Sequence, residues 1–178
     1  MNIPNALSFA RLVLAPVLLV IAWLHQPQLF LVVLVAAFFL DLIDGPIARH
    51  LHQVSVVGAE LDSIADFSIY IVFVIAAWML WPEIVIRESS YVALVAASVV
   101  VPVAFGVVKF GKPTSLHTWL VKAAAVVTAP SAIILFAGFA QWPFRVAAIV
   151  CACAAAEECL IIRRLAEPRS DVKSIFHA

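Results

Sequence analysis

Charged residues are scarce in this sequence, and their signs balance. They make up 12% of the 178 residues, whereas hydrophobic residues make up 65%, a composition that ordinary soluble domains do not approach. Eleven Lys and Arg residues offset eleven Asp and Glu residues, so the chain lacks the basic excess of proteins that bind nucleic acid or attach to a membrane surface. We therefore expect a protein embedded in membrane lipid, with no nucleic-acid partner.

Cysteine is also rare, and its spacing excludes two kinds of site. Cys151, Cys153 and Cys159 lie in one apolar segment. They lack the paired CxxC spacing of a zinc site and the even count of a secreted disulfide framework. We interpret them as small apolar residues that pack between helices.

The apolar runs predict an all-α polytopic membrane protein, a bundle of six transmembrane helices in one domain (1–178). A chain of this length has room for about six spans of roughly 20 residues. No small-residue cleavage site follows the first run, so we expect it to remain as a helix. The breaks between runs are short, which makes neighbouring helices antiparallel. The expected helices are 5–25, 28–50, 57–80, 91–110, 115–138 and 143–165.

The basic residues predict how the bundle is oriented. With a cytoplasmic N-terminus, nine Lys and Arg residues fall at or near the inner face, and only Arg87 and Arg145 fall outside. This bias predicts an inner (cytoplasmic) membrane protein of bacterial type, with both termini and the active site in the cytoplasm. Four tryptophans near the predicted outer ends fit an interfacial aromatic belt: Trp23, Trp78, Trp81 and Trp142.

Four aspartates interrupt the second and third predicted helices, where residues 41–67 read DLIDGPIARHLHQVSVVGAELDSIADF. An ionised carboxylate in a span costs about 2.5–3.5 kcal/mol, so four of them need metal, water or cationic partners. Asp41 and Asp44 are three residues apart, and Asp62 and Asp66 are four apart, so each pair shares one face of its helix. The intervening turn should bring both pairs together near the cytoplasmic surface. Hard oxygen donors of this kind favour Mg²⁺ or Mn²⁺ over zinc, and we expect two ions bridged by one aspartate.

Small residues beside these carboxylates leave space for a bulky ligand. Gly45 and Ala48 extend the first pair's face, and Gly58 precedes the second pair by one turn. Hard cations held by carboxylates imply a phosphate ligand, and a nucleoside diphosphate fits that description.

The same segment matches the signature DxxDGxxARx8GxxxDxxxD at all eight fixed positions, and the chain thereby resembles the CDP-alcohol phosphatidyltransferase family. The opening NIPNALSFARLVLAP is similar to the N-terminal helix of bacterial members. The resemblance implies a six-helix homodimer active in phospholipid biosynthesis. Its reaction would transfer a phosphatidyl group from CDP-diacylglycerol, or a similar CDP-alcohol, to a small polar acceptor alcohol with release of CMP.

The resemblance also implies roles for individual residues. Asp41, Asp44 and Asp62 would bind metal, while Asp66 would lie at the metal site and act as the general base, a role that suits a positioned carboxylate. The residues expected to bind the CDP-linked lipid are Asp41, Gly45, Ala48, Arg49 and Gly58.

The acceptor alcohol depends on weaker signals. Lys109, Lys112, His117 and Lys122 cluster at the predicted inner ends of the fourth and fifth helices and are candidates for binding it. Positive-inside anchoring also accounts for Lys109 and Lys112, and a hydrogen-bonded interfacial histidine also accounts for His117. The resemblance favours glycerol 3-phosphate, and inositol phosphate and serine stay open. Arg11 is expected either to contact a lipid phosphate or to extend to the interface.

Two other classes of function are compatible with an intramembrane acidic cluster. Divalent-metal and proton-coupled transporters usually carry such acids near the midplane of the membrane, whereas these cluster at one face. A membrane scaffold without enzymatic activity leaves the four aligned carboxylates unexplained. The sequence therefore favours an enzyme.

Overall fold

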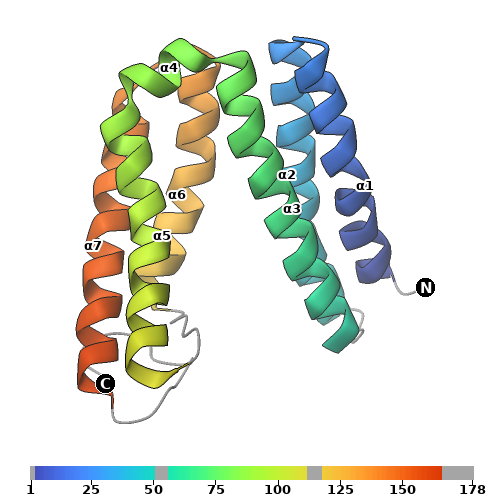
Figure 1. Ribbon diagram of the computed structural model, residues 1–178. Helices are drawn as coiled ribbons and strands as arrows, with labels where there is room; N and C mark the ends of the chain where they lie inside the picture. The colour runs from blue at the N-terminus through green and yellow to red at the C-terminus, as the bar shows by residue number, and fades with distance from the viewer. Residues whose placement is uncertain (1–2, 51–55, 112–117, 166–178) are drawn as a thin grey trace. The chain divides into compact units, whose positions relative to one another are not determined.

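The structure is a computed structural model that describes residues 3–50, 56–111 and 118–165, without the side chains of 3–4, 44–49, 56–57, 59–60 and 63. The described residues form α-helices and no strands (Figure 1), which confirms the all-α class. The helices are α1 (Ile3–Trp23), α2 (Pro27–His50), α3 (Val56–Leu80), α4 (Pro82–Arg87), α5 (Ser89–Phe110), α6 (Trp119–Phe136) and α7 (Trp142–Arg164).

The six long helices agree with the predicted ranges to within a few residues, and α4 is an addition. It lies in the predicted break at 81–90. Pro82 begins it, a position where the missing N–H of proline costs nothing. Glu83 in its first turn and Arg87 in its last have the signs that the helix dipole favours.

Local hydrogen bonds explain where α6 begins and where α1 ends. The helix predicted from 115 begins as α6 at Trp119, because the Thr118 hydroxyl accepts a hydrogen bond from the Val121 N–H at 3.2 Å and caps the helix. At the end of α1, His25 has a φ of +52°. The Gln26 N–H then bonds back to the Ile21 carbonyl at 3.2 Å, which turns the chain sharply into α2.

Among the residues whose side chains are described, three helical segments are long and apolar enough to cross a membrane: Asn5–Trp23, Ser89–Phe110 and Trp119–Phe136. The apolar segments of α2 and α3 are shorter, Pro27–Ile43 and Ile64–Leu80.

The chain divides into two compact units, residues 1–85 and 86–178. In the first unit α1 packs against both α2 and α3 (Figure 1). Each helix contributes a buried stripe with alternating three- and four-residue spacing, as helix packing requires. The stripes are Ser8, Arg11, Ala15, Leu18 and Ala22 on α1, Phe30, Leu34 and Ala37 on α2, and Ala65, Ile69, Val72 and Ala76 on α3.

In the second unit α7 packs against α5 and α6. Polar contacts join α5 to α7 at both ends. At the start of α5, Arg145 donates two hydrogen bonds to the buried Glu88 carboxylate, both 2.8 Å long. At its end, the Lys109 amine donates to the carbonyls of Ile162, Arg163 and Leu165, each at 2.8 Å. These contacts place α5 and α7 side by side in the same direction.

Candidate metal and phosphate site

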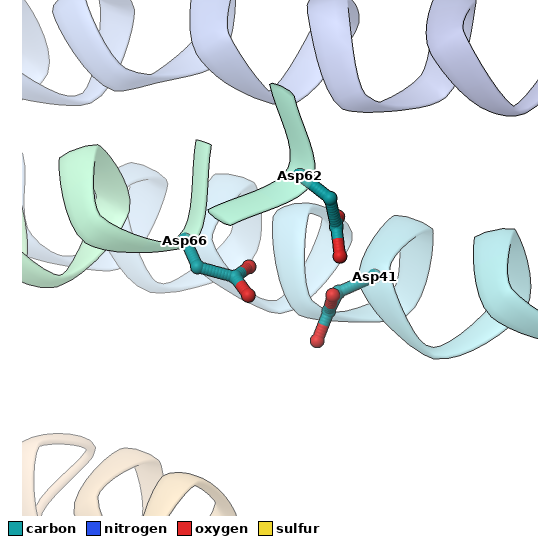
Figure 2. Close-up of side chains that lie close together, drawn as sticks. All are labelled: Asp41, Asp62 and Asp66. Carbon is teal, nitrogen blue, oxygen red and sulfur yellow. The ribbon is translucent and has the colours of Figure 1, made fainter. Parts of the chain in front are cut away.

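Three aspartates from two helices converge in the first unit. One carboxylate oxygen each from Asp41, Asp62 and Asp66 lies within 4.8 Å of the other two. Figure 2 shows Asp41 on α2 pointing toward Asp62 and Asp66, which lie one turn apart on α3. A polar cluster therefore interrupts the packing of otherwise apolar helices.

The helix stripes explain this convergence. Asp41 follows the buried Ala37 by four residues, and Asp62 precedes the buried Ala65 by three, so both continue stripes that face the centre of the unit. Asp41 and Asp62 also lie at similar distances from the ends of α2 and α3 that the connecting segment joins. At about 1.5 Å per residue, Asp41 lies roughly 14 Å before the end of α2 and Asp62 roughly 9 Å after the start of α3.

Arg11 of α1 lies among the three carboxylates. It is eight residues into α1, or about 12 Å from its start, and therefore reaches the same level. Its Nη1 lies 2.9 Å from Asp41 Oδ1 and donates to Asp62 Oδ1 at 2.7 Å, and its Nη2 donates to Asp66 Oδ1. All three aspartates thus pair with one guanidinium.

Burial differs between the two sides of this cluster. The Arg11 side chain is 3% exposed, whereas those of Asp41, Asp62 and Asp66 are 44%, 38% and 52% exposed. The arginine therefore closes the cluster from the protein interior, while the carboxylates remain accessible. Because three negative charges meet one positive charge, the cluster has a formal charge of −2.

This donor set fits a hard divalent cation. Carboxylate oxygens are the ligands that Mg²⁺ and Mn²⁺ prefer, and three of them converge from α2 and α3. The Arg11 guanidinium is one positive group that already pairs with these carboxylates. The accessible side of the carboxylates provides a path for an ion to enter.

The sequence profile of the family described as CDP-alcohol phosphatidyltransferase matches residues 1–157. The chain belongs to the CDP-alcohol phosphatidyltransferase family. A similar protein, named CDP-diacylglycerol--glycerol-3-phosphate 3-phosphatidyltransferase, from Aquifex aeolicus (strain VF5), is 38% identical over 66 residues, which are 37% of this chain and 37% of that protein. The match thus spans little more than a third of that relative. No solved structure matches the chain.

Several predicted site residues of this family member are described by their backbone alone. Asp44, Gly45, Ala48 and Arg49 lie in the last two turns of α2, and their side chains are outside the described part of the structure. Gly58 lies one turn before Asp62 on α3. All of these residues are therefore on the two helices that carry the aspartate cluster.

The predicted acceptor-binding residues are described at two of four positions. Lys112 and His117 lie outside the described residues. Lys109 uses its amine on three carbonyls at the end of α7. Lys122 is exposed, and its amine lies 5.6 Å from the centroid of the Trp119 ring.

Arg11 is the site residue for which the sequence predicted two alternative roles. Neither expected role, contact with lipid phosphate or extension to the interface, included an ion pair with the aspartates. The usable signal was the stripe Ser8, Arg11, Ala15 and Leu18, which places the arginine on the buried face of an apolar helix. A buried arginine requires an anionic partner, and the aspartates of the same unit can provide one.

Proposed function

We propose that this chain is a phospholipid-biosynthesis enzyme that transfers a phosphatidyl group from CDP-diacylglycerol to glycerol 3-phosphate and releases CMP. The observation that carries the proposal is the convergence of Asp41, Asp62 and Asp66 in a member of the CDP-alcohol phosphatidyltransferase family. The name of the Aquifex relative supports this donor and acceptor, through a match of 66 residues. Inositol phosphate and serine are the alternative acceptors.

In the proposed reaction the acceptor hydroxyl attacks the phosphorus next to the lipid. A new P–O bond forms, the bond between that phosphorus and the oxygen of CMP breaks, and the hydroxyl proton moves to Asp66. The exposure of the Asp66 carboxylate supports this role, because a general base must reach the nucleophile.

The other aspartates position the donor in this proposal. Asp41, Asp44 and Asp62 hold Mg²⁺ or Mn²⁺, which neutralises charge on the diphosphate and the leaving group when bound. Gly45, Ala48 and Gly58 would lie along the cytidine diphosphate, with Arg49 close by. Their positions on α2 and α3, within three turns of the cluster, support this arrangement.

The proposal includes a cytoplasmic site in an integral membrane homodimer. The bias of the basic residues supports placing both termini and the aspartates on the cytoplasmic side of a bacterial-type inner membrane. We also propose a single catalytic domain, because one family match runs through residues of both compact units.

An acceptor screen tests the proposal directly. The purified protein in lipid nanodiscs receives labelled CDP-diacylglycerol, Mn²⁺ or Mg²⁺, and one acceptor at a time from glycerol 3-phosphate, inositol phosphate and serine. We expect metal-dependent CMP release with glycerol 3-phosphate and a product lipid whose mass contains that acceptor. Asp62→Asn should lose the activity, and Glu83→Gln, an exposed acid on α4, should keep it.

Two other results would change the proposed acceptor or the proposed class of function. Product with inositol phosphate or serine alone would retain the reaction and replace the acceptor. No CMP release with any acceptor, together with divalent-metal uptake into proteoliposomes, would favour a transporter instead.

A further inference from the structure

Arg11 binds the carboxylate oxygens that a divalent cation would need. Its Nη1 lies between Asp41 Oδ1 on α2 and Asp62 Oδ1 on α3, at 2.9 and 2.7 Å, and its Nη2 reaches Asp66. A guanidinium so placed links all three acids of the cluster. It therefore occupies oxygens that a metal ion at this cluster would use.

The charges indicate why the protein would place an arginine there. Three carboxylates within 4.8 Å of one another repel strongly, and a protein without a bound cation must offset that repulsion. The exchange of Arg11 for another cation therefore requires that its side chain move away from the carboxylates. The long side chain permits such a movement without displacement of α1.

We propose that Arg11 is an exchangeable counter-ion that holds the three carboxylates together before metal binds and withdraws from them when a divalent cation takes its place. A buried guanidinium that loses its carboxylates needs another anion. The diphosphate of a CDP-linked ligand provides one, because arginine binds phosphate oxygens through two parallel N–H donors. This second step rests on the proposed function, whereas the exchange itself does not.

The first test measures Mn²⁺ binding to the full-length protein in detergent, without nucleotide or lipid substrate. Arg11→Gln removes the competing charge, and its dissociation constant for Mn²⁺ should fall by about tenfold or more. Arg11→Lys keeps the charge but loses the fork of donors, and should bind with intermediate affinity. The matched control is Arg145→Gln, which removes a carboxylate-paired arginine of the second unit and should bind Mn²⁺ as the wild type does.

Two results would overturn the exchange. Arg11→Gln with unchanged or weaker Mn²⁺ binding would mean that the arginine orients the metal ligands instead of competing with the metal. If neither the wild type nor Arg11→Gln binds Mn²⁺, the exchange is overturned as well, because no metal takes the place of the guanidinium. Because no substrate is present, either result leaves CMP release by the wild type as a separate test of the proposed function.

A second test uses the wild type alone and so does not depend on whether a variant folds. Phenylglyoxal modifies accessible arginines, and mass spectrometry of peptides gives the rate at each site. Modification of Arg11 should be slow without metal and should become several-fold faster at saturating Mn²⁺, while the rate at Arg145 stays constant. Slower modification of Arg11 with Mn²⁺ would overturn the exchange.

The phosphate step has its own measurement. Added CDP should tighten Mn²⁺ binding in the wild type, and this tightening should be at least several-fold smaller in Arg11→Gln, because the guanidinium that contacts the diphosphate is gone. Equal tightening in both proteins would overturn the phosphate step while leaving the exchange in place.

Discussion

Arg145 and Glu88 form a two-point ion pair across 57 residues of sequence. Arg145 Nε lies 2.8 Å from Glu88 Oε2, and Nη2 lies 2.8 Å from Oε1. The Glu88 side chain is 1% exposed, so the pair fixes the start of α7 against a carboxylate that has little access to water. Arg145 also lies over the Tyr91 ring, with Cζ 5.4 Å from its centroid.

Glu88→Gln should therefore destabilise the second unit. The variant keeps the shape of the side chain but loses the negative charge to which Arg145 donates two hydrogen bonds. It therefore leaves the guanidinium without its carboxylate. We expect the apparent melting temperature in detergent to fall by about 2–5 °C. Glu83→Gln is the control, because Glu83 is exposed on α4 and should change the melting temperature by less than one degree. Equal melting of both variants would contradict a stabilising role for the pair.

The same pair predicts a pH dependence with a defined sign. Hydrogen bonds from Arg145 lower the pKa of Glu88 from its usual value of 4.5, against the opposing effect of burial. The folded state therefore binds fewer protons than the unfolded state, and the stabilisation is complete above about pH 4.5 and is lost as the pH falls through the lower folded-state pKa.

The measurement compares melting temperatures of the wild type and Glu88→Gln between pH 8 and pH 3. The difference should be constant near neutral pH and should shrink below about pH 4.5. A difference that grows on acidification would show that the sign is wrong.

Lys109→Met tests the contact at the other end of α5. The wild-type amine donates to three carbonyls at the end of α7, where the last turn of a helix otherwise lacks partners. Without these bonds the end of α7 should fray, and amide hydrogen exchange at residues 161–165 should become about tenfold faster. Lys122→Met is the control and should leave these amides unchanged. Unchanged exchange in Lys109→Met would mean that packing of Ile161, Ile162 and Leu165 alone holds the end of the helix.

We propose Lys122, and not Lys109, as the described lysine that binds an acceptor phosphate. An ammonium group has three donors, and Lys109 uses three on carbonyls, whereas the Lys122 amine lies over the Trp119 ring, 5.6 Å from its centroid. In steady-state CMP-release assays, Lys122→Met should raise the KM for glycerol 3-phosphate by about tenfold, and the KM for CDP-diacylglycerol much less. Lys122→Arg should restore most of the acceptor affinity. Equal increases in both KM values would contradict acceptor binding by Lys122.

The sequence predicts the long helices more completely than it predicts the contacts within the aspartate cluster. The long helices follow from local hydropathy. The sequence did not predict α4, because its six residues are too few to show a helical hydrophobic period. Spacings of three and four residues also place Asp41 and Asp62 on stripes that continue from Ala37 and Ala65. These features depend on neighbours along one helix, which the sequence contains.

Arg11 depends on information of another kind. Its contacts with Asp62 and Asp66 join residues 51 and 55 apart, so they require the relative rotation of α1 and α3. Helix packing determines that rotation, and local spacing does not. The stripe Ser8, Arg11, Ala15 and Leu18 indicates that the arginine is buried, but not which acids it meets.

Asp66→Asn separates the proposed general base from the proposed metal ligands. The amide keeps the size of the side chain and can still accept a hydrogen bond, but it cannot take the acceptor proton, so kcat should fall by about 10³-fold or more. Because Asp41 and Asp62 retain their carboxylates, Mn²⁺ affinity should change by less than about tenfold. Asp62→Asn is the matched control one turn away, and it should weaken Mn²⁺ binding by more than that.

Two measurements on the same preparations check this division of roles, CMP release for turnover and titration calorimetry for Mn²⁺. Activity within tenfold of the wild type would remove Asp66 from the chemical step. If Asp66→Asn weakens Mn²⁺ binding as much as Asp62→Asn does, Asp66 contributes to metal binding as strongly as Asp62. Asp62 and Asp66 both pair with Arg11, so each substitution removes one negative charge beside the guanidinium. A difference in Mn²⁺ affinity between the two variants therefore reports on metal binding by the aspartates and not on the loss of charge near Arg11.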